Sequence, residues 1–221
     1  MQLAVEVKNL TKTFHRKCRQ IAALKQIDFQ VSRGETVVLM GPNGAGKTTL
    51  LKILATLILP NNGSANVFGL NCAKEERQVK KKIGFLSSDD RNCFWRLTGR
   101  QNLDFFAGLF GLSGKERRRK IGEFQELFDL SFLDQRVGEY STGMKKRLSL
   151  ARCLMHNPDL LLLDEPTKGL DSKTSDRLNH YLKEELSKKN GKTMMVVTHH
   201  LPEMEKVAGR VLRLENGRLV S

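Results

Sequence analysis

The chain has few cysteines, and their spacing fits neither a zinc site nor a disulfide framework. The four stand at positions 18, 72, 93 and 153 and form no Cys-x-x-Cys pair. Structural zinc sites and small disulfide-rich domains both need closely spaced cysteines, so neither class is indicated. A reduced, intracellular setting fits this cysteine usage best.

Long hydrophobic runs are absent as well. The longest apolar stretch, LLKILATLILP at residues 50–60, is shorter than a membrane-spanning helix and contains Lys52. The amino end, MQLAVEVKNL, lacks the basic flank and the apolar core of a signal peptide. We therefore expect no leader and no segment that crosses a bilayer unaided.

Acidic residues are scarce relative to basic ones, with 24 Asp and Glu against 38 Lys and Arg and a formal net charge of +14. Such an excess favours an anionic partner, and nucleic acid, an acidic lipid surface and phosphate all qualify. The basic residues gather in the segments 77–82, 115–120 and 145–147. The first two segments suit a solvated helix face equally well, so charge alone does not choose a partner.

A helical middle lies between two β-rich ends. With 221 residues and 39% hydrophobic content, the chain can form one domain with a subdomain. Near the start, LAVEVKNLTKTF and QIDFQV alternate apolar and polar residues and predict an antiparallel β layer, whereas TVVLM predicts a strand covered on both faces. Helical patterns predict an inserted subdomain at residues 87–156. Residues 1–86 and 157–221 are expected to form the core and the β layer of a single α/β domain.

The segment GPNGAGKTT predicts a phosphate-binding loop, because it fits the pattern G-x-x-x-x-G-K-[ST] and has a strand pattern before it and a helix pattern after it. Backbone N–H groups of such a loop turn toward an anion, and the helix N-terminus adds partial positive charge. Lys47 is expected to reach the β and γ phosphates of a nucleotide triphosphate, and Thr48 to ligate Mg²⁺. The predicted nucleotide contacts are Gly41, Pro42, Asn43, Gly44, Ala45, Gly46, Lys47, Thr48 and Thr49.

Two acids and a histidine follow apolar strand patterns later in the chain. LLLLDEP ends in Asp164 and Glu165, and VVTHH contains His199, so all three are expected at the carboxyl edge of a core sheet, where α/β folds bind ligands. Asp164 suits Mg²⁺, and Glu165 suits the water that attacks a γ-phosphate, with Lys47 and His199 as further catalytic groups. An acidic strand end and an ordinary surface histidine are the alternative interpretations, and His200 competes with His199.

Five segments in this order, GPNGAGKTT, YSTGM, LLLLDEP, KGLD and VVTHH, resemble the nucleotide-binding subunit of ATP-binding cassette (ABC) transporters over essentially the whole chain. YSTGMKKR, together with the preceding FWRLTGRQNLDFF, is most similar to the ATPase subunits of ABC-2-type exporters. The resemblance implies a P-loop NTPase core of α/β class, with an N-terminal antiparallel β subdomain and an inserted helical subdomain. It also implies ATP and Mg²⁺ as cofactors and ATP hydrolysis as the reaction.

The resemblance further implies a second ATPase subunit, expected to be another copy of this chain. The turn YSTGM, residues 140–144, is here called the signature turn. In the family it caps the γ-phosphate of ATP held by the partner cassette, which implies such a role for Ser141 and Gly143. By the same resemblance, Asp171 lies in the loop that crosses between cassettes, and Phe14 stacks on adenine.

A separate membrane-spanning permease subunit is also implied, and it would hold the chain at the cytoplasmic face of the cell membrane. The expected docking surface is the segment 87–98, with Phe94 and Trp95 as apolar anchors. The alternative function is a soluble ABC ATPase that acts on nucleic acid, suggested by the positive charge. Nucleic acid is the less favoured partner, because the chain has neither a long coiled-coil insertion nor a duplicated cassette. Attraction to an anionic membrane surface is the favoured explanation of the charge.

The sequence departs from the family pattern at two places. Tyr140, Thr142 and Met144 replace three members of the usual Leu-Ser-Gly-Gly-Gln. The glutamine that normally follows the strand KIGFL is replaced within SSDD, which puts Ser88 or Asp89 at that position. Asp89 is expected to serve Mg²⁺ or the attacking water, whereas Ser88 is too short to reach as a glutamine does.

Overall fold

The computed structural model describes residues 2–16, 19–87, 93–198 and 209–220. Among the predicted site residues, Asp89 and His199 lie outside these ranges, as do Ser88 and His200. None of the helices in the described ranges combines the length and the apolarity needed to span a bilayer.

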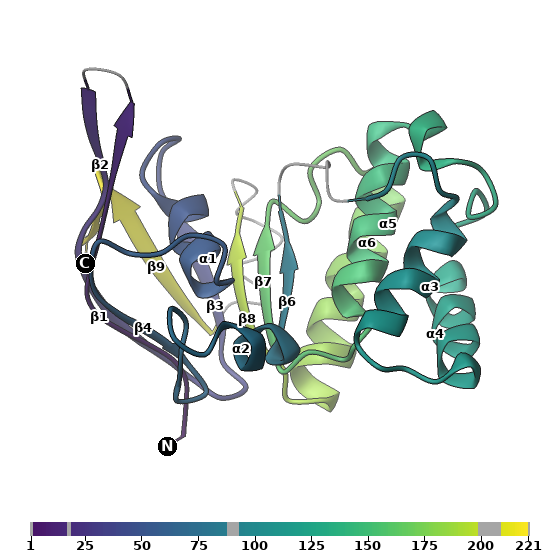
Figure 1. Cartoon of the computed structure of the whole chain (residues 1–221), viewed down its shortest axis with the longest axis horizontal. Coiled ribbons are helices and arrows are strands. Elements are labelled where there is room, and N and C mark those ends of the chain that lie inside the picture. Colours follow the sequence, from purple (N-terminus) through teal and green to yellow (C-terminus); the bar gives the residue numbers. More distant parts are fainter. Residues whose placement is uncertain (1, 17–18, 88–92, 199–208, 221) are drawn as a thin grey trace.

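Two β-sheets form the framework (Figure 1). The larger has the strand order β10-β9-β3-β8-β7-β6, and all its neighbouring pairs are parallel except β10 with β9. Its strands are β3 (Thr36–Met40), β6 (Ile83–Leu86), β7 (Leu160–Asp164), β8 (Thr193–Val197), β9 (Arg210–Glu215) and β10 (Arg218–Val220). The second sheet is antiparallel with the order β2-β1-β4-β5. Its strands are β1 (Leu3–Arg16), β2 (Arg19–Ser32), β4 (Asn62–Val67) and β5 (Leu70–Asn71).

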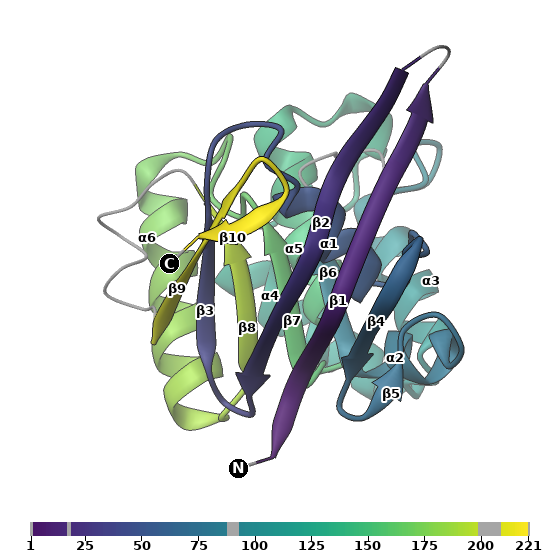
Figure 2. The ribbon, with the colours of Figure 1, turned by 90° about the vertical axis from the view of Figure 1, so that its left-hand side faces the viewer.

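The helices lie on both sides of the parallel sheet. They are α1 (Lys47–Leu54), α2 (Glu76–Lys82), α3 (Gly99–Leu109), α4 (Gly114–Leu127), α5 (Thr142–Leu154) and α6 (Ser172–His180), with the 3₁₀ turn η1 (Val137–Glu139) before α5 and the π-helical segment η2 (Tyr181–Lys189) continuing α6. Figure 1 shows α1 between the two sheets and α3 to α6 together on the other side of the parallel sheet. Figure 2 shows the long strands β1 and β2 crossing the front of this arrangement.

Strand β7 shows why the central strands are apolar throughout. All its residues are buried. Leu160 and Leu162 pack in a cluster with α1 and the antiparallel sheet, whereas Leu161 and Leu163 pack in a second cluster with α5 and α6. Because successive side chains of a strand point to opposite faces, a strand covered on both faces needs a continuous apolar run. The predicted α/β fold, with its antiparallel β layer and its added helices, is confirmed.

Hydrogen bonds from side chains fix where the helices of the helical layer begin. Thr98 and Gln101 form a capping box at α3, and Ser113 and Glu116 form another at α4. Such a cap satisfies backbone N–H groups that the first turn leaves without helical partners.

Tyr140 ties the start of α5 to the preceding loop. Its hydroxyl donates a hydrogen bond of 2.9 Å to the backbone carbonyl of Phe132, and the two rings meet edge to face with centroids 4.7 Å apart. The side chain is buried, which raises the pKa of the phenol to about 12. The signature turn is therefore anchored at its first residue.

We expect Tyr140→Phe to lower the free energy of unfolding by about 0.5–1.5 kcal/mol, because the hydrogen bond from the hydroxyl is lost while the carbonyl of Phe132 keeps the N–H of Gln135 as a donor. Urea denaturation at neutral pH measures this change. Tyr181→Phe is the control, since it removes a hydroxyl from a half-buried ring that packs on Phe128. Equal stability of Tyr140→Phe and wild type would show that the hydroxyl does not anchor the turn.

Candidate active site

The carboxyl ends of the parallel strands meet at one edge of the sheet. Leu39 of β3 pairs with Val197 of β8, and Val197 pairs with Asp164 of β7. A cavity of about 580 Å³ opens at this edge. Its lining comes from both sheets, from the loop before α1 and from the end of β7, namely Phe14, Ile21, Ala23, Asn43, Gly44, Ala45, Gly46, Lys47, Thr48, Thr49, Asp164, Glu165, Lys168 and Val197.

Lys47 is the first residue of α1 and is buried. Its ammonium donates to the backbone carbonyls of Gly41 at 2.6 Å and Pro42 at 2.9 Å. Burial lowers the pKa of Lys47, while the nearby carboxylates of Glu165 and Asp164 act in the opposite direction. The cation is thus held across the loop, in partly desolvated surroundings where its attraction for a phosphate is strengthened.

The N-terminus of α1 faces the same cavity and carries no competing acid. Its N-cap is Gly46, with a φ of 108° that favours glycine, and no side chain caps the first turn by a hydrogen bond. A Cβ atom at this position would lie 2.3 Å from the backbone oxygen of Ala23, so a larger residue does not fit. The first backbone N–H groups and the helix dipole therefore favour an anion at this end.

Thr48 and Asp164 bring two oxygen donors together. The hydroxyl of Thr48 donates a hydrogen bond of 2.9 Å to Oδ2 of Asp164, whose side chain is buried. Hydroxyl and carboxylate oxygens are the ligands that Mg²⁺ prefers, so this pair fits the ion.

Glu165 follows Asp164 in an uncommon backbone conformation. Its φ is 51°, in the left-handed region, and its N–H donates to the backbone oxygen of Val197 at 2.9 Å. A non-glycine residue in this region costs of order 1–3 kcal/mol, and such residues concentrate at functional sites. The conformation brings Glu165 to the cavity beside Asp164, where the side chain is 9% exposed.

Phe14 lies at the opposite side of the cavity, on the antiparallel sheet. Its ring is 36% exposed and lines the cavity with Ile21 and Ala23. The ammonium of Lys12 lies 5.1 Å from the ring centroid. The ring is therefore available for contact with a flat group.

The signature turn and Asp171 do not line this cavity. Ser141 is exposed, and its hydroxyl accepts the N–H of Met144 at 3.2 Å as the N-cap of α5. Asp171 caps α6 by accepting the N–H and the hydroxyl of Thr174, which lowers the pKa of its carboxyl.

Gly143 has a packing reason to be glycine. A Cβ atom there would lie 3.0 Å from the backbone oxygen of Gly169, so the signature turn rests closely on the KGLD loop of its own chain. A larger residue at this position would require the two segments to separate by a few tenths of an ångström, whether or not a phosphate approaches.

Two side chains of the basic segment 145–147 are held by backbone carbonyls of the chain itself. Lys146 is only 2% exposed and donates to backbone carbonyls. Arg147 donates to the backbone oxygen of Asp129 at 2.9 Å and lies 4.9 Å from the ring centroid of Phe132. A signal for the burial of Lys146 exists in the sequence, since Leu150 and Cys153 follow it at helical spacing.

Comparison with known proteins agrees with this geometry. Residues 24–168 match the family model described as ABC transporter. The chain is 30% identical to the ABC transporter ATP-binding protein NatA of Bacillus subtilis (strain 168), over 98% of this chain and 87% of that protein. It is 35% identical to the Nod factor export ATP-binding protein I of Burkholderia orbicola, over 98% of this chain and 69% of that protein. Some relatives are longer, and the chain spans 37% of one of them.

Solved structures give the same result. The chain superposes with a TM-score of 0.90 on a dimeric post-hydrolysis structure of the ATP-binding cassette MJ0796 bound to ADP and Pi, at 32% identity, covering 98% of this chain and 97% of that one. The family match covers more than half of the chain, and the fold agrees over nearly all of it. The chain therefore belongs to the ABC transporter family, as one of its ATP-hydrolysing cassettes.

Proposed function

We propose that this chain is the ATPase subunit of an exporter and powers transport through a separate membrane-spanning subunit. The observation that carries the proposal is the convergence of Lys47, Thr48, Asp164 and Glu165 on one cavity at the edge of the parallel sheet. The direction of transport is supported by the relative named for Nod factor export.

Each part of ATP has a proposed place in this cavity. Phe14 stacks on adenine, and residues 41–49 hold the phosphates, with Lys47 against the terminal ones. Thr48 and Asp164 hold Mg²⁺, for which Asp89 is a proposed further ligand. When bound, the ion neutralises charge that develops on the phosphates during transfer.

Hydrolysis is proposed to follow from positioning more than from covalent chemistry. Glu165 accepts the proton of the water that attacks the γ-phosphate in line, and the amides of the loop with Lys47 stabilise the oxygens of the transferred group. His199 is proposed to contact the same phosphates.

A second copy of the chain is proposed to complete the site. Ser141 and Gly143 do not line the cavity of their own chain, and Ser141 is exposed at the start of α5. In a head-to-tail pair, the hydroxyl of Ser141, the backbone at Gly143 and the dipole of α5 would face ATP held by the other copy, with Asp171 at the crossing. The dimeric structure of the similar cassette supports this arrangement.

The proposed docking surface for the membrane subunit is the aromatic pair Phe94 and Trp95. Their side chains are 46% and 63% exposed. The backbone of Phe94 is clamped by Asn102, which accepts its N–H at 2.7 Å and donates to its carbonyl at 3.0 Å, and its ring meets Phe105 edge to face at 5.1 Å. Aromatic anchors that are ordered beforehand lose little entropy on binding. Docking there would hold the chain at the cytoplasmic face of the membrane.

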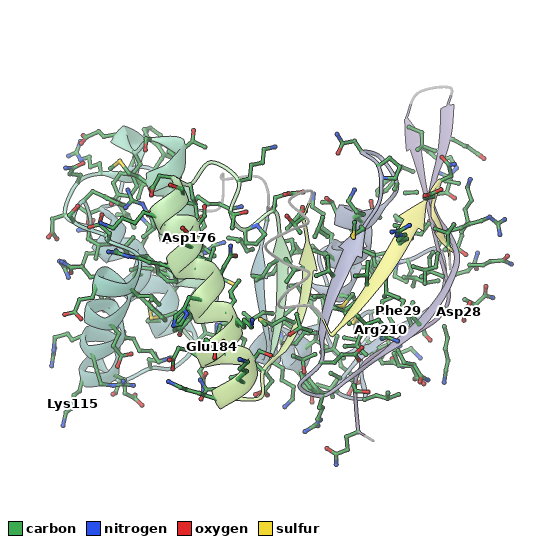
Figure 3. The ribbon with its side chains drawn as sticks, turned by 180° about the vertical axis from the view of Figure 1, so that it is seen from behind. Asp28, Phe29, Lys115, Asp176, Glu184 and Arg210 are labelled. Atoms are coloured by element: carbon green, nitrogen blue, oxygen red, sulfur yellow. The ribbon has the colours of Figure 1, made fainter. Side chains whose placement is uncertain are left out.

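Glu165→Gln should slow ATP hydrolysis by about 100-fold or more, because an amide does not accept the proton of the attacking water. An ATP-bound dimer should then accumulate. Light scattering with saturating ATP and Mg²⁺ would report twice the mass of one chain. Glu184→Gln, on η2 in Figure 3, loses only an exposed pair with Lys188 and should hydrolyse ATP at the wild-type rate. A Glu165→Gln protein that stays monomeric under these conditions would refute the two-copy site.

Trp95→Ala should leave basal ATP hydrolysis within about twofold of wild type but weaken membrane docking by about tenfold or more, since buried tryptophans often dominate interfaces. The measurement is the fraction of chain retained on washed membranes that contain the native subunits. Leu59→Ala is the matched control, because Leu59 is 62% exposed but lies on the loop after α1. Unchanged retention of Trp95→Ala, or equal loss of retention and hydrolysis, would count against this surface.

A further inference from the structure

Lys146 connects α5 to the ends of two strands that build the active site. Its ammonium donates to the backbone carbonyls of Ser87 and Asp164, each at 3.4 Å. Ser87 directly follows β6, and Asp164 ends the neighbouring strand β7. Burial of an ammonium disfavours folding unless its donors are used, and these carbonyls accept two of its three N–H groups.

The carbonyl of Asp164 belongs to the peptide unit that leads into Glu165. The N–H of that same unit donates to Val197 of β8 at 2.9 Å. The plane of the peptide is therefore held from both ends, by Lys146 of α5 and by Val197. Rotation of this plane would redirect the side chain of Glu165, whose left-handed φ leaves it few alternative conformations. Lys146 thus acts on the direction of Glu165 without touching the substrate.

Helix α5 carries both Lys146 and the signature turn. Ser141 is the N-cap, and Lys146 lies five residues further along, which is about 7–8 Å of helix. Because an α-helix moves as a rigid element over such a distance, a displacement of the signature turn would move the ammonium of Lys146 against Asp164.

We propose that Lys146 is a positioning residue that aims Glu165 for hydrolysis and makes this aim depend on the placement of the signature turn. The proposal rests on the proposed function, because it deepens the role of Glu165 there. Lys146 would contribute to hydrolysis by fixing the orientation of Glu165. Lys146→Met would remove the cost of desolvating a charge but would also remove a donor from the carbonyls of Ser87 and Asp164, so its two effects on stability oppose each other.

Steady-state ATP hydrolysis by Lys146→Met tests the proposal. Misplacement of a catalytic group by about 1 Å can cost about 100-fold, so we expect kcat to fall by about 10- to 100-fold with the KM for ATP changed less than about twofold. The midpoint of thermal unfolding should stay close to that of wild type. Lys115→Met, at the exposed outer end of the helical layer in Figure 3, is the matched control and should match wild type in all three quantities.

A double-mutant cycle with Glu165→Gln separates aiming from a general structural role. If Lys146 acts through Glu165, Lys146→Met should lower the single-turnover rate by less than about twofold when Glu165→Gln is already present. Lys146→Gln keeps an uncharged hydrogen-bond donor on a shorter side chain, so its kcat should lie between those of Lys146→Met and wild type. The same double-mutant cycle can be run with Lys146→Gln if Lys146→Met does not fold.

An equal loss in both backgrounds, a raised KM at unchanged kcat, or wild-type kcat in both Lys146 variants would overturn the proposal. Failure of the role proposed for Glu165 is distinguishable, because Glu165→Gln alone would then hydrolyse ATP at the wild-type rate. Wild-type hydrolysis that is indifferent to position 146 would overturn this inference alone.

Discussion

The parallel register of β3, β8 and β7 is the constraint on which the whole site depends. It ends the three strands at one edge, with Val197 between Leu39 and Asp164. From there the six residues between β3 and α1 form the loop, and the first turn of α1 brings Thr48 within 2.9 Å of Asp164. A slip of β7 by one residue would turn Asp164 to the opposite face of the sheet and put an apolar side chain against Thr48. The apolar clusters on both faces prevent that slip, so core packing fixes the chemistry at the edge.

The same edge concentrates buried polar groups that an apolar core would exclude. Lys47, Lys146, Asp164 and Glu165 are all buried. The two ammonium groups use backbone carbonyls, and Asp164 accepts from Thr48, so the cost of removing these groups from water is offset by hydrogen bonds. The remaining desolvation cost and the left-handed backbone at Glu165 both lower the stability of the fold. In return, the polar groups are held in position in advance. Groups already held in place need no reorganisation when charge develops on a phosphate.

The sequence predicts the parts of this site that are local in the chain. The loop before α1 is recognisable because strand, glycines, lysine and helix follow one another within a short segment, and β7 because a two-face-buried strand must be apolar throughout. Burial of Lys146 is harder to predict from the sequence, because it depends on how α5 packs against the ends of β6 and β7. A run of basic residues next to a turn is more typical of an exposed segment. Ser141 and Asp171 show a different limit. Both are N-caps here, and the residue types that cap helices are also those that bind phosphates, so type alone does not separate the two roles.

In the proposed two-copy arrangement, α5 would contribute to two sites, with its signature turn at the cavity of the other copy and Lys146 behind Glu165 of its own. The N-terminus of α5 presents Ser141 away from the cavity, whereas the side chain of Lys146 returns to the end of β7. Two contacts at the start of α5 limit how the helix moves. The hydroxyl of Tyr140 is bonded to the loop before the helix, and Gly143 packs on the KGLD loop. In the proposed two-copy site, a nucleotide that engages the signature turn of one copy would act on a rigid element whose next turn contacts that copy's own Asp164–Glu165 peptide. Because the helix is rigid over this distance, the proposed engagement at one cavity and the alignment of Glu165 at the other would need no flexible segment between them.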